Sequence, residues 1–207
     1  MYKTFKKFTA TLFTGAVLLA TPFAANAAVV LSLQPVASKV EVGSAVTVNL
    51  VVSGLGNHST PSVSAFDVDI SYDASLFSLS AFNYGPSLGS LALGEALTTL
   101  SNSAGTISAS ELSLLETSST TCSFCTGPYL EDLQGSTLTL ASLTFTALHY
   151  GTGTFNLVAN AFADGFGDAL TIDQVTGANV AVPAPAALWL FGTGLAALGI
   201  TRGRARS

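Results

Sequence analysis

A serine, an aspartate and a histidine occur in this 207-residue chain in an order that a hydrolase could use. Gly85-Pro-Ser-Leu-Gly89 has the Gly-x-Ser-x-Gly spacing that exposes a nucleophilic serine at a sharp turn, and Asp132 and His149 follow it. Such a turn works at a strand–turn–helix junction within an alternating α/β pattern. That pattern is absent from this sequence, so we expect the serine to lie in a Ser/Gly-rich loop and the chain not to be an enzyme.

The two cysteines, Cys122 and Cys125, are separated by two residues. This spacing suits a redox-active dithiol or half of a zinc site. Zinc would require two more ligands, and the two histidines, His58 and His149, lie in unrelated segments. Oxidation is favoured outside the cytoplasm, so in an exported chain we predict a disulfide that staples a local loop.

Two groups of aspartates are candidates for cation binding. Asp164 and Asp168 bracket a glycine-rich loop and could offer oxygens to Ca²⁺, although the loop lacks the EF-hand spacing. The alternative is a turn that uses Asp and Gly for backbone geometry. Asp67 and Asp69 alternate along a strand pattern, where they lie on a solvated face or contact a partner or ion. We expect no cofactor other than this possible calcium.

The elements that would hold these residues have the pattern of short strands. Residues 66–72 alternate apolar and polar side chains, and residues 45–52 do the same. Further strands are expected at 29–33, 76–82, 105–112, 138–147, 153–161 and 175–182, and a short helix or a loop at 88–99. About nine strands separated by Gly and Ser/Asn clusters predict an all-β fold: one antiparallel two-sheet sandwich.

The N-terminus differs from this pattern. Three lysines precede an apolar run over residues 8–20, and Ala25 and Ala27 satisfy the small-residue rule for cleavage. Residues 1–27 are therefore predicted to be a Sec signal peptide, with a signal helix.

The C-terminus combines an uncharged apolar run, residues 186–200, with three arginines. As a helix the run would span about 23 Å, which is marginal against a hydrocarbon core of about 30 Å. The arginines resist crossing, so everything before Val182 is expected to face away from the cytoplasm. Pro183 and Pro185 hold the preceding chain extended and accessible, which suits a permanent anchor or one that a processing enzyme removes. The arginines are Arg202, Arg204 and Arg206.

This C-terminal order of Val182-Pro183-Ala184-Pro185, apolar run and arginines resembles the PEP-CTERM sorting signal of Gram-negative bacteria. The family usually has Glu where this chain has Ala184. The resemblance implies passage through the Sec machinery, transient anchoring in the inner membrane, handling by an exosortase, and release to the cell surface or extracellular matrix. It divides the chain into a signal peptide (1–27), an exported domain (28–181) and a sorting signal (182–207).

The exported domain is strongly acidic. Of the seven Lys and Arg residues, three lie in the signal peptide and three in the tail, which leaves Lys39 against all twelve Asp and Glu and a net charge of about −11. Such a domain would repel nucleic acid, whereas it is compatible with divalent cations.

The same domain resembles cohesin domains. Val42-Gly-Ser-Ala-Val-Thr-Val-Asn-Leu50 is similar to a cohesin opening, as is the alternating run 66–73, and 140–147 with 153–163 resembles the closing strands. The resemblance covers nearly all of residues 29–182 and implies a jelly-roll sandwich of about nine strands. Cohesins of cellulosomes bind dockerins through one sheet face, but no dockerin-contact residue can be assigned to this sequence.

These observations predict a non-enzymatic, exported protein that mediates adhesion, matrix scaffolding or protein–protein contact through a sheet face or loops. The alternative is a carbohydrate-binding module of the extracellular polysaccharide matrix. That role normally requires a platform of exposed aromatic side chains, for which the candidates are Phe82, Tyr84, Tyr129 and Phe166. The protein or polysaccharide partner is not identified by the sequence.

Overall fold

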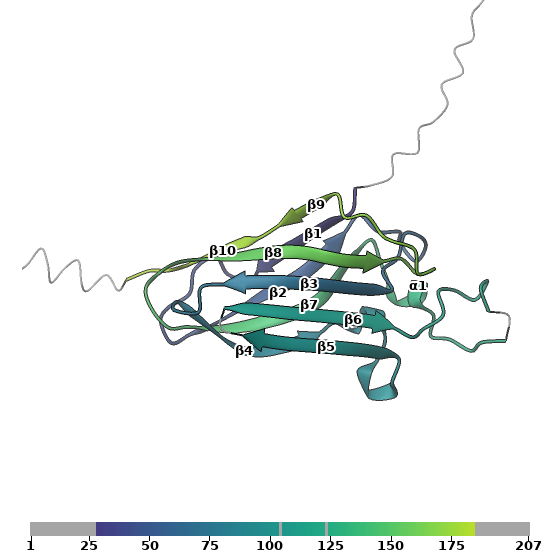
Figure 1. The fold of residues 1–207 in the computed structure, drawn as a ribbon, viewed down its shortest axis with the longest axis horizontal. Coiled ribbons are helices and arrows are strands. Elements are labelled where there is room, and N and C mark those ends of the chain that lie inside the picture. The colour runs from purple at the N-terminus through teal and green to yellow at the C-terminus, as the bar shows by residue number, and fades with distance from the viewer. Residues whose placement is uncertain (1–27, 104, 123, 185–207) are drawn as a thin grey trace, which may run out of the picture.

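The computed structural model describes residues 28–103, 105–122 and 124–184, which fold into two five-stranded sheets packed face to face (Figure 1). One sheet has the order β4-β7-β2-β1-β9 and the other β10-β8-β3-β6-β5. The predicted all-β, two-sheet sandwich is therefore confirmed, with ten strands in place of about nine. The strands are β1 (Val30–Pro35), β2 (Ala45–Ser53), β3 (Ala65–Tyr72), β4 (Phe77–Tyr84), β5 (Ala96–Ser103), β6 (Thr106–Ser113), β7 (Thr137–Ala147), β8 (Gly151–Ala163), β9 (Gln174–Thr176) and β10 (Ala178–Val182).

Strict alternation explains the orientation of β3, the central strand of its sheet. Phe66, Val68 and Ile70 are fully or almost fully buried between the sheets, while Asp67 and Asp69 point outward. In a strand with one apolar and one polar face, a slip of one residue would turn the apolar set to solvent. In the observed register β3 pairs antiparallel with β6 on one side and with β8 on the other.

Aromatic side chains fill the core at one end of the sandwich. Phe145 of β7 lies with its ring centroid 4.9 Å from that of Phe155 of β8 and 5.0 Å from that of Tyr72 of β3. Phe77 of β4 packs on Phe155 at 5.2 Å. Because β4 and β7 belong to one sheet and β3 and β8 to the other, this cluster joins the two layers.

The segment 88–99 was expected to be a helix or a loop, and the structure corrects this. Two short 3-10 turns, η1 (Pro86–Leu88) and η2 (Leu91–Leu93), are followed by the edge strand β5. The left-handed backbone at Gly94 ends η2 and turns the chain into β5. Only Ala96 of β5 is buried, so this strand lacks the apolar face that identifies a strand in a sequence.

The predicted last strand, 175–182, is in fact two strands in different sheets. β9 pairs with β1 and β10 pairs with β8, so the chain crosses from one sheet to the other at Gly177. A Cβ atom at Gly177 would stand 2.3 Å from the carbonyl oxygen of Phe155, which explains why glycine is required there. The β1–β9 pair is parallel, so the sandwich is not entirely antiparallel.

Both predicted terminal helices fall outside the described residues, as do Ala25, Ala27, Pro185 and the three C-terminal arginines. Within the described ranges, no helix is long and apolar enough to cross a membrane. The strand β10 ends at Val182, which is buried and pairs with Gly151, so the sandwich includes the first residue of the predicted sorting motif. Pro183 and Ala184 follow it and are exposed.

Candidate functional site

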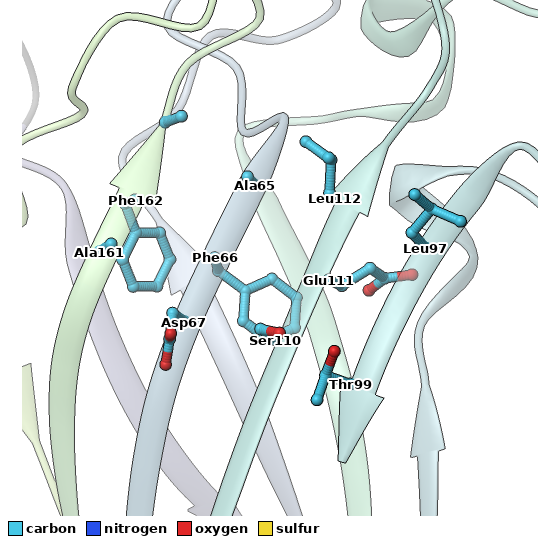
Figure 2. A pocket seen from close by; sticks show the side chains of 11 residues that line it. Ala65, Phe66, Asp67, Leu97, Thr99, Ser110, Glu111, Leu112, Ala161 and Phe162 are labelled. Atoms are coloured by element: carbon cyan, nitrogen blue, oxygen red, sulfur yellow. The ribbon is translucent and has the colours of Figure 1, made fainter.

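Four strands form a shallow hollow of about 390 Å³ in the sheet β10-β8-β3-β6-β5 (Figure 2). It is lined by residues 65–67 of β3, 110–112 of β6 and 161–163 of β8, with Leu97 and Thr99 of β5. The pairing register explains the arrangement, because Leu97 lies opposite Leu112 and Thr99 lies opposite Ser110. Cross-strand partners share a face, so these four side chains stand on the outer surface of the sheet.

The outer face around the hollow has an apolar part and a polar part. Leu97 is 58% exposed, Leu112 45% and Val158 of β8 54%, which is unusual for large aliphatic side chains that share one sheet face. Beside them Asn160 donates its side-chain N–H groups to Asp67 at 3.1 Å and to Asp69 at 2.9 Å. The face therefore offers both apolar area and fixed carboxylates.

Hydrogen bonds favour the ionised form of Asp69. The Ser108 hydroxyl donates to Asp69, and this bond, followed by the bond from Asn160, holds the pKa of Asp69 below its usual value. Asp67 and Asp69 thus share a strand face as the sequence predicted, and within the described residues no third carboxylate joins them in a cation-binding group.

Beneath the hollow lies Glu111, a buried carboxylate that the sequence analysis did not single out. Its side chain is on the inner face of β6, where Phe66 of β3 and Thr98 of β5 are its cross-strand neighbours. It is only 2% exposed, and neither carboxylate oxygen has a hydrogen-bond partner among the described residues. Burial disfavours the charged form and raises the pKa of Glu111 to about 7.

Tyr84, the last residue of β4, closes the edge of the sandwich over Glu111. Its hydroxyl donates to the carbonyl oxygen of Thr99 at 2.7 Å, which ties the two sheets together. Its ring centroid lies 6.4 Å from that of Phe66 and 4.9 Å from that of Phe82. Burial, and then the charge of Glu111, raise the pKa of Tyr84 to about 12.

The structure does not assemble the serine, aspartate and histidine of the hydrolase-like order. Ser87 lies in η1, beyond Tyr84 at one end of the β4–β7 ladder, whereas His149 lies beyond Ala147 at the other end. The length of that ladder, about 20 Å, separates them. The carbonyl of Ser87 instead accepts a hydrogen bond from the buried Gln134 side chain.

Cys122 and Cys125 are joined by a disulfide in the long connection between β6 and β7, with their Cα atoms 5.4 Å apart. The Tyr129 hydroxyl donates to the carbonyl of Cys125 at 2.6 Å and folds this loop back on itself. Glu116 lies near both sulfurs, and this is the only group of three possible ligands found in the described ranges. Sulfurs in a disulfide are not thiolates, so we interpret the bridge as a loop staple.

Asp164 organises the loop that the sequence suggested as a calcium site. One of its carboxylate oxygens accepts the backbone N–H of Phe166 at 2.9 Å and that of Asp168 at 3.0 Å. This is the geometry of a turn closed by its own aspartate. Calcium binding at Asp164 and Asp168 stays a prediction.

The aromatic residues considered for carbohydrate binding do not form a shared platform. Phe82 and Tyr84 pack edge to face on one another, and the hydroxyl of Tyr129 is engaged within its loop. Phe166 is 59% exposed but stands in a different loop. No arrangement of these four side chains therefore favours the carbohydrate-binding alternative.

A search of protein-family models and a search of curated proteins each found no match. Among solved structures, a cohesin of Clostridium acetobutylicum superposes with a TM-score of 0.54 at 20% identity, covering 76% of this chain and 92% of that one. A type I cohesin of Clostridium thermocellum, solved with a dockerin, gives 0.57 at 11% identity, covering 75% and 99%. A non-cellulosomal cohesin from Archaeoglobus fulgidus gives 0.54 at 10% identity, covering 76% and 93%. The described residues therefore have the cohesin fold.

Proposed function

We propose that this domain is an exported protein-binding module that docks a partner protein on the outer face of the β8-β3-β6-β5 strands. The observation that carries the proposal is the hollow itself, where Leu97 and Leu112 are exposed side by side next to the Asp67 carboxylate. Apolar area with a polar border is the usual composition of a specific protein interface. Several solved cohesins of the same fold are described in complexes with dockerins, which supports a protein as the partner.

The position of the hollow also suits a chain that is held at its C-terminus. Val182 pairs with Gly151 at the start of β8, whereas residues 161–163 of the hollow are at the end of that strand. After β10, the described chain leaves the sandwich at the end opposite to α1 (Leu130–Leu133), as Figure 1 shows. If the sorting signal anchors the chain, the hollow lies about 30 Å from the point of attachment, where a partner can reach it.

Photo-crosslinking in the producing cell tests the docking face. A photoreactive residue in place of Leu112 is expected to form a crosslink to another protein, whereas the same residue in place of Val36 is not. Val36 is a matched control because it is 72% exposed, lies in the turn after β1 and is remote from the hollow. Equal protein crosslinking at both positions, or crosslinks to polysaccharide alone at Leu112, would contradict the proposal.

Export and sorting complete the proposal. The signal peptide, the motif from Val182 to Pro185 and the arginine tail support Sec export followed by exosortase processing and release to the cell surface or matrix. Intact-mass measurement of the protein recovered outside the cell is expected to show a start at Ala28 and loss of residues after the motif. Recovery of the full 207-residue mass in the membrane fraction would oppose this.

A further inference from the structure

The carboxyl group of Glu111 has an unusual position for an exported, acidic domain. A buried carboxylate is normally paired with a cation or accepts hydrogen bonds, because removal of its charge from water is costly. Glu111 has neither type of partner in the described ranges. Burial costs the ionised carboxylate more free energy than it costs the neutral acid. Loss of the proton from Glu111 therefore favours any opening that exposes the side chain to water.

The edge strand beside Glu111 is the least secured part of its sheet. β5 is an edge strand that pairs only with β6, and all of its residues except Ala96 are exposed. Its link to the other sheet is the hydrogen bond from Tyr84 to the carbonyl of Thr99. Segments with little buried apolar area open locally at lower free energy than the core does.

We propose that Glu111 acts as a proton-operated latch on β5: the neutral carboxyl group lets β5 stay paired beside it and bonded to Tyr84, and loss of the proton releases the strand. Opening would admit water to the carboxylate, which restores the solvation that the closed state denies to the ion. The proton is therefore a ligand of the closed state, and the opening equilibrium depends on pH.

Among the groups that face Glu111, none changes its charge in the pH range in which Glu111 titrates. Tyr84, on β4, is the titratable group that faces it, and the pKa of Tyr84, raised to about 12, keeps that hydroxyl neutral throughout the relevant range. The cross-strand neighbours Phe66 and Thr98 carry no charge. On β6 itself Ala109 and Ser113, two positions away on the same face, are also uncharged.

The latch deepens the proposed function, since β5 supplies Leu97 and Thr99 to the hollow. Release of β5 would remove one wall of the docking face, so a partner would bind more tightly below neutral pH than above it. This consequence rests on the proposed function, whereas the release of β5 does not. The test is therefore made on the protein alone.

Hydrogen exchange of the full-length protein, followed by NMR and divided by the intrinsic exchange rate at each pH, measures the opening of β5. We take the pKa of Glu111 to be about 7 in the closed state and the usual 4.5 of a glutamate in the open state. Protection of the β5 amides is then expected to fall by about tenfold between pH 6 and pH 8. Protection in the central strand β2 should exceed that of β5 at both pH values, because β5 opens locally whereas β2 exchanges only when the sandwich unfolds. In Glu111→Gln the fall should disappear, while Asp67→Asn, which alters an exposed carboxylate on the outer face, should retain it.

Carboxyl ¹³C signals of the five glutamates in the wild-type protein provide an independent measurement that needs no variant. One signal is expected to titrate near pH 7 together with the loss of β5 protection. The latch is wrong if all five titrate in the usual acidic range, or if β5 protection falls equally in Glu111→Gln. If the latch is confirmed and crosslinking at Leu112 fails, the proposed docking function alone is contradicted.

Discussion

The Glu111→Gln variant is expected to be more stable than the wild type at pH 8 by about 3 kcal/mol. The pKa of Glu111 is raised from 4.5 in the unfolded chain to about 7 in the folded one. The unfolded state therefore loses its proton first, and the wild type loses stability as pH rises from about 4.5 to 7. Above that range the penalty is complete.

Denaturant unfolding at pH 4.5, 6 and 8 measures this effect. The two proteins should be nearly equal at pH 4.5 and diverge progressively above it. Glu41→Gln is the matched control, because it replaces the same side chain by the same amide at a position that is exposed. Parallel responses of wild type and Glu111→Gln to pH would show that the Glu111 carboxylate is solvated in the folded protein.

The parts of the fold that could be predicted are the strands whose own residues alternate between apolar and polar. Residues 66–72 alternate strictly and became β3, with its apolar side chains inside and Asp67 and Asp69 outside. In contrast, β5 was not predicted, and its Leu97 and Leu100 are three residues apart, a spacing that does not fit the alternation of a strand. In the structure these two leucines point to opposite faces of an exposed edge strand, where packing does not impose a pattern.

The burial of Glu111 could not be predicted from the sequence of β6 alone. Ile107 and Ala109 predict one inward face, and continued alternation places Glu111 on it. The adjacent Leu112, however, suggests that Leu112 points inward and Glu111 outward at the end of the strand. A glutamate is normally exposed to solvent, which favours that second assignment. Burial of Glu111 depends on Tyr84, which arrives from the other sheet.

The hollow, too, could not be predicted from any one segment of the sequence. Its lining comes from the consecutive strands β5 and β6 together with β3 and β8, which are far from them in the chain, and their adjacency follows from the order β8-β3-β6-β5. The sequence could indicate a sheet face as the place of contact, but not which face or which end. The resemblance to cohesins gave the architecture, and the exposed pair Leu97 and Leu112 locates a surface on it.

Replacement of Phe145 by alanine is expected to have the largest effect on stability, a loss of about 3–5 kcal/mol. Phe145 is fully buried and its ring contacts Tyr72 and Phe155 of the opposite sheet. Its strand β7 pairs with β2 on one side and β4 on the other, so the backbone cannot move inward to fill the cavity. The cost therefore includes both lost apolar burial and an unfilled void.

The matched control is Phe124→Ala in the loop stapled by the disulfide, because that phenylalanine is 99% exposed. It should change the free energy of unfolding by less than about 0.5 kcal/mol. Denaturant unfolding of both variants at one pH compares them directly, because Glu111 is present in each and contributes equally. A loss below about 1 kcal/mol in Phe145→Ala would mean that the two sheets can repack without this ring, and that the aromatic cluster is not what joins them.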